Sequence, residues 1–371
     1  MPVSCQEIIS LLEMIAPPKM AESWDQGIGL QLGDPDQIIE NVMFSLDLDS
    51  EVLAEAIDKR TDLLVVHHTP FFRPLKNLRR DTVEGRLISE MVIHGMSLYA
   101  MHTNLDSVSG GVSDVLAEKL ELRETVVLIP GWKQSLFKLV VYTPESYADR
   151  IKQAFYETKA GWIGNYADCT FLTRGFGTFR PLENTSPFCG KQGELENVEE
   201  VRIETIVTEE RLEQTVNTML QVHPYGEPAY DILPLANDGH ISGLGRVGFL
   251  PREMALWEFA AKVKDVLKTQ NIRCCGDMNT RIIKAALCGG SGADYWRKAL
   301  KSGAQVYLTA DIKYHEAQDA VANGICLVDA GHYATEKPVM HVLAARVERS
   351  LRQKGIRVVV SAVDTNPFVH F

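Results

Sequence analysis

Imidazoles and carboxylates follow directly on several short apolar segments of this chain. One segment rich in valine and leucine ends in His67 and His68, and another ends in His102, with Asp106 four residues later. Nitrogen and oxygen donors of these types bind Zn²⁺, Mn²⁺ and Fe²⁺ in proteins. Because ligands collect at the carboxyl ends of parallel strands, we expect these side chains to meet at one edge of a sheet.

Two further apolar segments end in residues of the same chemistry, Asp311 and His332. Glu336 lies four residues after His332, which puts both on one face if the chain turns helical there. A single histidine at such a position is more often a hydrogen-bonded structural residue than a ligand, so the prediction depends on the combination. We expect metal ligands at His67, His68, Asp106, His332 and Glu336. Candidate orienting or acid/base groups are His102, Asp311 and His315.

The adjacent histidines indicate two metal ions instead of one. Neighbouring side chains on a strand point to opposite faces, so His67 and His68 are not expected to chelate a single ion. Two ions remove this difficulty if Asp106 or Glu336 bridges them. Three imidazoles and two carboxylates without cysteine fit Zn²⁺ first, then Mn²⁺ or Fe²⁺, and disfavour an all-oxygen Ca²⁺ site. A pair of ions roughly 3.5–4 Å apart can activate water, which favours a hydrolase.

The elements that position these residues alternate between short apolar runs and helical patterns. This rhythm predicts βαβ units, and therefore an α/β domain with mainly parallel mixed sheets flanked by helices. In the first part of the chain, the expected strands are 42–46, 63–66 and 98–101, with helices 52–59, 83–94 and 112–120. In the last part, the expected strands are 282–287, 306–309, 325–328 and 358–363, with helices near 294–300 and 315–322 and one ending near 352.

The middle of the chain has a different pattern. Strands are expected at 136–142, 200–207 and 229–235, helices at 145–158 and 209–222, and a stretch rich in glycine and proline at 161–193. Repeated β-α-β order without metal-type residues at strand ends suggests a small ferredoxin-like α+β domain inserted into the larger one. Turn signals near Pro130 and Asn237 mark its limits. The predicted domains are residues 1–130, 131–237 and 238–371.

Composition bounds the class of protein. The chain has 371 residues, of which 45% are hydrophobic and 23% charged, with a net charge of −11. The charge makes nucleic-acid binding unlikely, and no apolar run is long enough to span a membrane. The first apolar stretch lacks a basic leader, so a cytoplasmic location is expected. The basic stretch 73–80 could attract an anionic small molecule, although a solvated loop explains it equally well.

Four segments resemble a known family, the Nif-three-like dinuclear-metal-centre proteins, also called GTP cyclohydrolase I type 2 homologues. The resemblance covers nearly the whole chain and is carried by residues 24–31, 66–72, 102–106 and 331–336. It implies that the same five residues hold two metals and that the protein forms a hexameric ring. Residues 163–166 and 223–231 are similar to the family's inserted domain, which is PII/CutA-like.

Two motifs have a plainer interpretation. Trp24 and Asp25 are expected to form a turn that closes the amino-terminal helix. His223 and Tyr225, which lie around Pro224, are expected to form a rigid turn, with ligand sensing as the alternative.

The sequence is compatible with three interpretations of the protein's function. The first is a metal-dependent hydrolase of a nucleotide-like or phosphorylated small molecule, as the GTP cyclohydrolase label implies. The second is a non-enzymatic hexameric ring that senses metal or a ligand through the inserted domain. A purely structural assembly protein is a third interpretation, and it predicts that no metal is bound.

Overall fold

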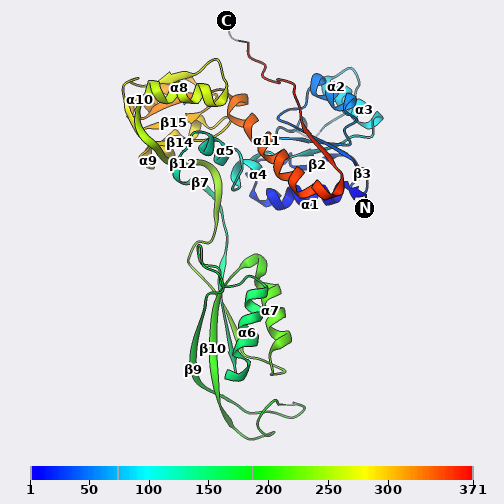
Figure 1. Ribbon diagram of the computed structural model, residues 1–371, viewed down its shortest axis with the longest axis vertical. Helices are drawn as coiled ribbons and strands as arrows, with labels where there is room; N and C mark the ends of the chain where they lie inside the picture. The colour runs from blue at the N-terminus through cyan, green and yellow to red at the C-terminus, as the bar shows by residue number, and fades with distance from the viewer. Residues whose placement is uncertain (1, 73–74, 186, 370–371) are drawn as a thin grey trace. The chain divides into compact units, whose positions relative to one another are not determined.

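The computed structural model describes residues 2–72, 75–185 and 187–369, which form two compact units (Figure 1). The first unit comprises Met1–Trp132 and Ser242–Phe371, and the second comprises Lys133–Ile241. The limits predicted from turn signals lie at residues 130 and 237. Among the described residues, no helix combines the length and apolar character needed to cross a bilayer.

The first sheet of unit 1 has the strand order β17-β4-β5-β6-β2. The strands are β2 (Gly29–Leu32), β4 (Asn41–Ser45), β5 (Leu63–Val66), β6 (Ser97–Ala100) and β17 (Arg357–Val360). The pairs β17/β4, β4/β5 and β5/β6 are parallel, whereas β2 runs antiparallel to β6. Every residue of β5 and β6 is buried, because helices cover both faces of a parallel sheet.

Helices α1 (Cys5–Ile15) and α11 (His332–Leu351) pack on one face of this sheet, and α2 (Ser50–Asp58) and α3 (Val83–Ile93) pack on the other (Figure 1). Alternate residues of β4 divide between the two cores: Phe44 joins the first and Met43 the second. A short pair of strands, β1 (Val3–Ser4) and β3 (Ile38–Ile39), and the 3-10 turn η1 (Pro18–Met20) complete this part.

The second sheet of unit 1 has the order β13-β16-β15-β14-β12-β7. Its strands are β7 (Arg123–Lys133), β12 (Ile241–Ala255), β13 (Arg273–Cys275), β14 (Arg281–Leu287), β15 (Val306–Thr309) and β16 (Cys326–Asp329). The strands β14, β15 and β16 are parallel, and β12 and β13 pair with them in the antiparallel sense. Both sheets are therefore mixed, in an α/β architecture of the predicted kind.

Helix α11 connects the two sheets, because it contacts β4 and β17 of the first sheet and α5 and α8 beside the second. The remaining helices are α4 (Thr103–Ser107), α5 (Val112–Lys119), α8 (Leu256–Leu267), α9 (Trp296–Lys301) and α10 (Tyr314–Ala322), with the 3-10 turns η3 (Ala293–Tyr295) and η4 (Arg352–Lys354). One continuous hydrophobic core includes residues of α1, α5, α8 and α11. The start of α11 is thus fixed relative to the strand ends of the first sheet.

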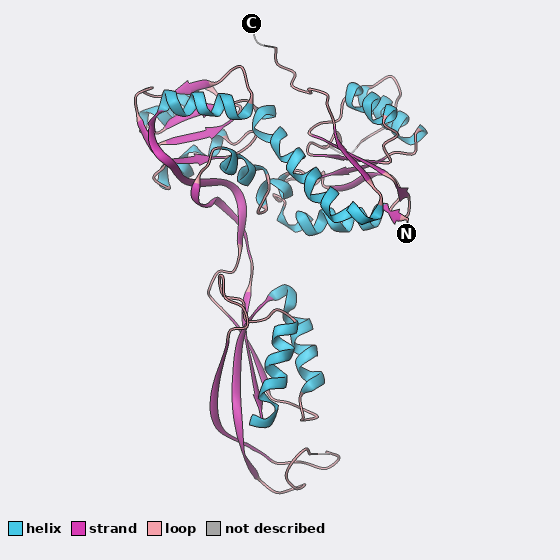
Figure 2. Cartoon of the chain, in the orientation of Figure 1, coloured by secondary structure: helices cyan, strands magenta, loops and turns pink. Residues whose placement is uncertain are grey.

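Unit 2 has the element order β-α-β-β-α-β. It consists of β8 (Leu136–Thr143), η2 (Glu145–Tyr147), α6 (Ala148–Glu157), β9 (Thr170–Phe179), β10 (Glu196–Thr208), α7 (Glu209–Val222) and β11 (Tyr230–Pro234). The strands form an antiparallel sheet in the order β11-β8-β10-β9. The two helices lie on one side of this sheet (Figure 2). This is a ferredoxin-like arrangement.

Strand β9 corrects one expectation. No strand is predicted within the stretch 161–193, which is rich in glycine and proline, but ten of its residues form this strand. Strand β9 lies at the edge of the sheet and most of its residues are exposed. An exposed edge strand does not need the alternation of apolar and polar residues from which strands are predicted.

Candidate metal centre

His67 and His68 leave the carboxyl end of β5 and turn toward the start of α11. The backbone N–H groups of both residues donate to the carbonyl of Leu46, at 3.1 and 2.9 Å, which fixes the turn beside the end of β4. The side chain of His67 is fully buried, and that of His68 is 26% exposed. The pair therefore reaches inward from the sheet edge with its second imidazole partly open to solvent.

The carboxylates come from two helices. Asp106 lies on α4, which follows β6, and Glu336 lies one turn into α11. His332 is the first residue of α11, so its side chain and that of Glu336 share one helix face. The helix begins after Gly331, whose φ of 86° is accessible to glycine at little cost.

Glu336 lies at the centre of the cluster. Its Oε1 is 3.8 Å from Nε2 of His67, and its Oε2 is 2.9 Å from Nε2 of His68 and 3.1 Å from Nε2 of His332. Asp106 Oδ1 is 3.6 Å from Nε2 of His67. Among the described residues, three groups have metal-ligand geometry, and two of them contain Glu336: one is His67, Asp106 and Glu336, and the other is His68, His332 and Glu336. Of the two bridging carboxylates considered from the sequence, Glu336 is the one shared.

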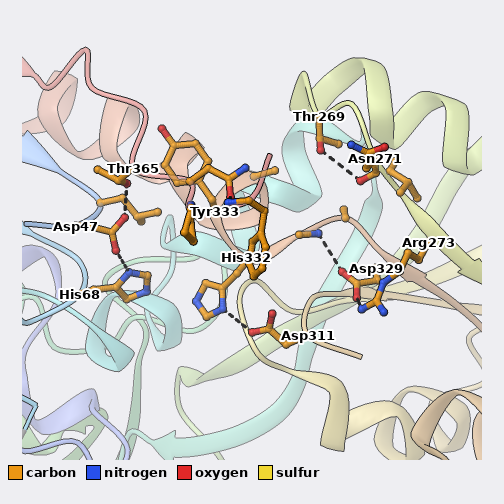
Figure 3. Close-up of a pocket in the computed structure, with 18 of the residues that line it drawn as sticks. Asp47, His68, Thr269, Asn271, Arg273, Asp311, Asp329, His332, Tyr333 and Thr365 are labelled. Carbon is orange, nitrogen blue, oxygen red and sulfur yellow. Dashed lines mark hydrogen bonds and ion pairs between the residues drawn. The ribbon is translucent and has the colours of Figure 1, made fainter. Parts of the chain in front are cut away.

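Each of the three imidazoles is oriented through its other nitrogen. Nδ1 of His67 donates to the Met101 carbonyl at 2.8 Å. Nδ1 of His68 lies 2.6 Å from Asp47 Oδ1, and Nδ1 of His332 lies 2.7 Å from Asp311 Oδ2 (Figure 3). Because all three acceptors engage Nδ1, Nε2 is the nitrogen of each imidazole that faces the cluster and could bind a metal ion, as in metal-ligating histidines.

The buried atoms of the cluster lack hydrogen-bond partners. In the part of the chain that the structure describes, His67 Nε2, Asp106 Oδ1 and Glu336 Oε2 are buried with no hydrogen-bond partner of acceptable geometry. Leaving such groups unsatisfied is costly. Cations between them would satisfy all three, so the donor set fits divalent metal ions.

The electrostatics of the cluster also favour positive charge. Burial lowers the pKa of His68, but Asp47 and Glu336 outweigh it and raise the pKa to about 10. Burial likewise lowers the pKa of His332, and Glu336 and Asp311 raise it to about 9. Burial raises the pKa of Glu336, yet the surrounding histidines hold it well below its usual range.

His102 joins the cluster, and His315 does not. Ligand atoms of His67, His68 and His102 lie within 4.8 Å of one another. Nδ1 of His102 is 2.9 Å from Asp25 Oδ2, so a carboxylate also supports this imidazole, in poorer hydrogen-bond geometry than Asp47 gives His68. His315 is exposed on α10, where its Nδ1 lies 3.3 Å from Gln318 Oε1. Among the described residues, no metal-type group includes it.

Two supporting carboxylates were missed in the sequence. Asp47 follows the end of β4 by two residues, so the strand-end rule applied to residues 42–46 would have found it. Asp25 belongs to the segment interpreted as a turn, but its buried carboxylate also accepts hydrogen bonds from the Thr103 N–H at 3.1 Å and the Thr103 hydroxyl at 2.6 Å.

The basic stretch 73–80 is only partly described, because Arg73 and Pro74 lie outside the described residues. Arg79 donates from Nε to Asp81 at 2.9 Å, and Arg80 lies 3.4 Å from Glu90. The charge of these two side chains is therefore partly compensated by nearby carboxylates.

A pocket of about 980 Å³ adjoins the cluster on the side of His68 and His332 (Figure 3). Apart from His68 and His332, which are paired with Asp47 and Asp311, its charged lining is mainly acidic. The acidic residues are Asp47, Asp49, Asp311 and Asp329, and one arginine, Arg273, lies among them. Arg273 is hydrogen-bonded to Asp329, so an anion entering the pocket meets little uncompensated positive charge from the protein itself.

Comparisons of the sequence and of the structure with known proteins point to the same family. The sequence profile of the family described as Duf34/NIF3 (NGG1p interacting factor 3) matches residues 3–367. Proteins called "GTP cyclohydrolase 1 type 2 homolog" are 43% identical over 365 residues in Halalkalibacterium halodurans and 44% identical over 368 residues in Bacillus subtilis, with 98% of each relative covered. A Bacillus cereus protein described as related to NIF3 has a similar structure, with a TM-score of 0.91, 38% identity and complete coverage of both chains.

Proposed function

The chain belongs to the Duf34/NIF3 family, and from this premise we propose that it is a dinuclear metal-dependent hydrolase of a nucleotide-like or otherwise phosphorylated small molecule. The observation that carries the proposal is the position of Glu336, whose two oxygens face two separate groups of ligands. A carboxylate shared in this way is the feature that a two-ion site needs and a single-ion site does not.

In this proposal, His67, Asp106 and Glu336 hold one ion, and His68, His332 and Glu336 hold the other. Zn²⁺ suits the imidazole and carboxylate donors best, with Mn²⁺ or Fe²⁺ as alternatives. Two divalent cations would supply electrophilic activation of a substrate oxygen and a water of lowered pKa.

The protein's own groups position and move protons. His102 is held through Nδ1 by Asp25, so its Nε2 is free to accept a proton from the attacking water and return it to the leaving group. Asp47 and Asp311 keep His68 and His332 oriented through Nδ1. His315 has no part in this scheme, because it lies on the exposed surface of α10.

The substrate class follows from charge and from the relatives' names. The acidic lining of the pocket disfavours a phosphate unless cations compensate it, so we place the anionic end of the substrate at the metal ions. The name shared by the relatives, "GTP cyclohydrolase 1 type 2 homolog", makes opening of a purine ring the specific reaction to test. GTP turnover by zinc-loaded protein is compared with that of a His68→Ala, Glu336→Ala double variant. Equal rates would exclude the cyclohydrolase activity.

A second candidate is a non-enzymatic sensor. Unit 2 contains a pocket of about 550 Å³ whose lining includes Arg180, Glu200 and Tyr225, and the hydroxyl of Tyr225 lies 2.9 Å from Glu200 Oε1. A PII/CutA-like insert would bind a small ligand there and transmit the signal through a homohexameric ring. Thermal-shift screening of the wild type and of Tyr225→Leu distinguishes the candidates: sensing requires ligand responses that the substitution removes while metal content stays unchanged.

The proposal also includes a homohexameric assembly and a cytoplasmic location. A hexameric ring predicts a mass six times that of one chain by light scattering. A cytoplasmic protein is expected to fractionate with soluble intracellular markers.

A further inference from the structure

Three aromatic side chains form a continuous surface beside the candidate metal centre. The ring centroids of Trp24 and Phe72 are 6.0 Å apart, and those of Trp24 and Phe72 lie 6.0 and 6.1 Å from that of His102. The imidazole meets both rings nearly edge-on, at 77° and 78°. We call Trp24, Phe72 and His102 the aromatic wall.

The aromatic wall continues into the ligand cluster. His102 lies 5.3 Å from His67 and 5.6 Å from His68, measured between ring centroids. Only 16% of the His102 side chain is exposed, whereas Trp24 and Phe72 are each 55% exposed. The wall therefore runs from an exposed aromatic pair, through His102, to the nitrogen atoms assigned to the metals.

The segments that carry the two exposed rings are fixed against each other. A Cβ placed on Gly27 would lie 2.4 Å from Cγ2 of Thr69, so the backbone of the first segment packs directly on the second. The Thr69 hydroxyl also accepts the N–H of Phe71 at 3.1 Å. Asp25, next to Trp24, is buried and bonded to Thr103. Both aromatic side chains thus stay exposed on segments that tertiary contacts hold in place.

Exposed apolar side chains are common, and isolated ones need no explanation. Trp24 and Phe72 differ because they adjoin each other and a histidine of the candidate site. Aromatic surfaces of this kind bind flat conjugated rings by stacking, and the stacking tolerates many ring types because every base has a π-face.

We propose that the aromatic wall binds the planar heterocyclic ring of the substrate, a purine-like base, while the anionic end of the same molecule reaches the metal ions. This inference rests on the proposed function and specifies its substrate class. It also assigns Trp24 a role in recognition, where the sequence indicated only a turn. Trp24 and Phe72 are specificity-determining residues in this account, and His102 touches both the ring and the reacting end.

The test compares a ligand that has the ring with one that lacks it. Binding of GTP and of inorganic tripolyphosphate to zinc-loaded, full-length protein is measured by isothermal titration calorimetry for the wild type, Trp24→Leu and Phe72→Leu. Trp257→Leu is the matched control, because Trp257 on α8 is exposed to the same extent, 54%, and lies outside the aromatic wall and the pocket. We expect each wall variant to weaken GTP binding roughly 10-fold, within the range that base stacking supplies. Tripolyphosphate binding by the wall variants, and GTP binding by Trp257→Leu, should equal those of the wild type.

Three results would overturn the inference. These are equal affinity of the wild type for GTP and tripolyphosphate, unaltered GTP binding by both wall variants, and an equal loss of GTP binding in Trp257→Leu. Tryptophan fluorescence is also followed while the protein is diluted without ligand. A change in the wild type that is absent from Trp24→Leu would show that a second copy of the chain covers the aromatic wall, and this result would also contradict the inference.

The metal content of each sample separates this inference from the proposed function. Protein that holds two zinc ions but does not distinguish the ligands contradicts only the aromatic wall. Protein that holds no zinc, but binds GTP more tightly than tripolyphosphate and loses this preference in Trp24→Leu, contradicts only the metal site. The wild type and Trp24→Leu are therefore titrated with and without a chelator.

Discussion

The carboxylate of Glu336 lies directly against the backbone of Gly290. A Cβ built on Gly290 would fall 2.0 Å from Glu336 Oε1 and 3.3 Å from His332 Nε2. The N–H of Gly290 is fixed by the hydroxyl of Thr335 at 3.0 Å, so the backbone has little room to move away. A side chain at position 290 would therefore displace the carboxylate on which both ion positions depend.

Gly290→Ala should reduce metal binding by more than half. Elemental analysis of the purified variant is expected to show less than half of the wild-type metal content. Gly324→Ala is the matched control, because Gly324 also has a positive φ, 86° against 63°, but a Cβ there would have no neighbour within 4 Å. Both variants carry backbone strain of about 1–2 kcal/mol, so equal metal losses would show that strain, and not contact with Glu336, is responsible.

Glu336→Gln should reduce metal content from two ions to less than one per chain. The amide keeps the shape of the side chain but removes the negative charge and one oxygen donor shared by both ligand groups. Glu348→Gln, at an exposed position further along α11, is expected to retain both ions. Retention of two ions by Glu336→Gln would contradict the bridging role.

Asp47→Asn should weaken metal binding without removing it. Asp47 holds Nδ1 of His68, and the loss of such a supporting carboxylate typically lowers metal affinity by about 10- to 100-fold. Competition titrations against a zinc chelator measure the change. Asp58→Asn, an exposed position at the end of α2, serves as control, and an Asp47→Asn variant with wild-type affinity would argue against this role.

Asp25 should make the protein sensitive to acid. Burial raises the pKa of this carboxyl, but hydrogen bonds from His102 and Thr103 outweigh it and lower the pKa to about 2 from 3.8. A depressed pKa contributes stability above the unfolded value, and the contribution is lost as the pH falls from about 4 toward 2. At pH 7 it amounts to about 2 kcal/mol.

Urea unfolding of the wild type and of Asp25→Asn at several pH values checks this linkage. The difference in the free energy of unfolding should be largest at neutral pH and should narrow below pH 4. A difference that does not vary with pH would mean that the charge of Asp25 contributes nothing to stability.

The sequence predicts which candidate residues lie together, because their positions follow from sheet geometry. Two local features can be recognised from the periodicity of the sequence. One is the end of each strand that precedes His67 and Asp106, and the other is the helical spacing of His332 and Glu336. The order of the strands, and the way in which α11 brings His332 to the first sheet, depend on contacts between residues far apart in the chain, which no local pattern encodes.

The supporting residues are harder to predict for the same reason. Asp25 and His102 are 77 positions apart in the sequence, and only the folded chain shows that they meet. His315 illustrates the opposite error, because a histidine near a strand end can lie on the outer face of the following helix. Strand β9 was missed because an exposed edge carries no burial pattern.

Anomalous X-ray scattering at the zinc edge, from crystals of zinc-loaded protein, tests the central claim most directly. The account predicts two peaks, roughly 3.5–4 Å apart, each about 2.0–2.2 Å from its donor atoms. One should lie on His67, Asp106 and Glu336, and the other on His68, His332 and Glu336. A single peak, or peaks that do not share Glu336, would contradict it.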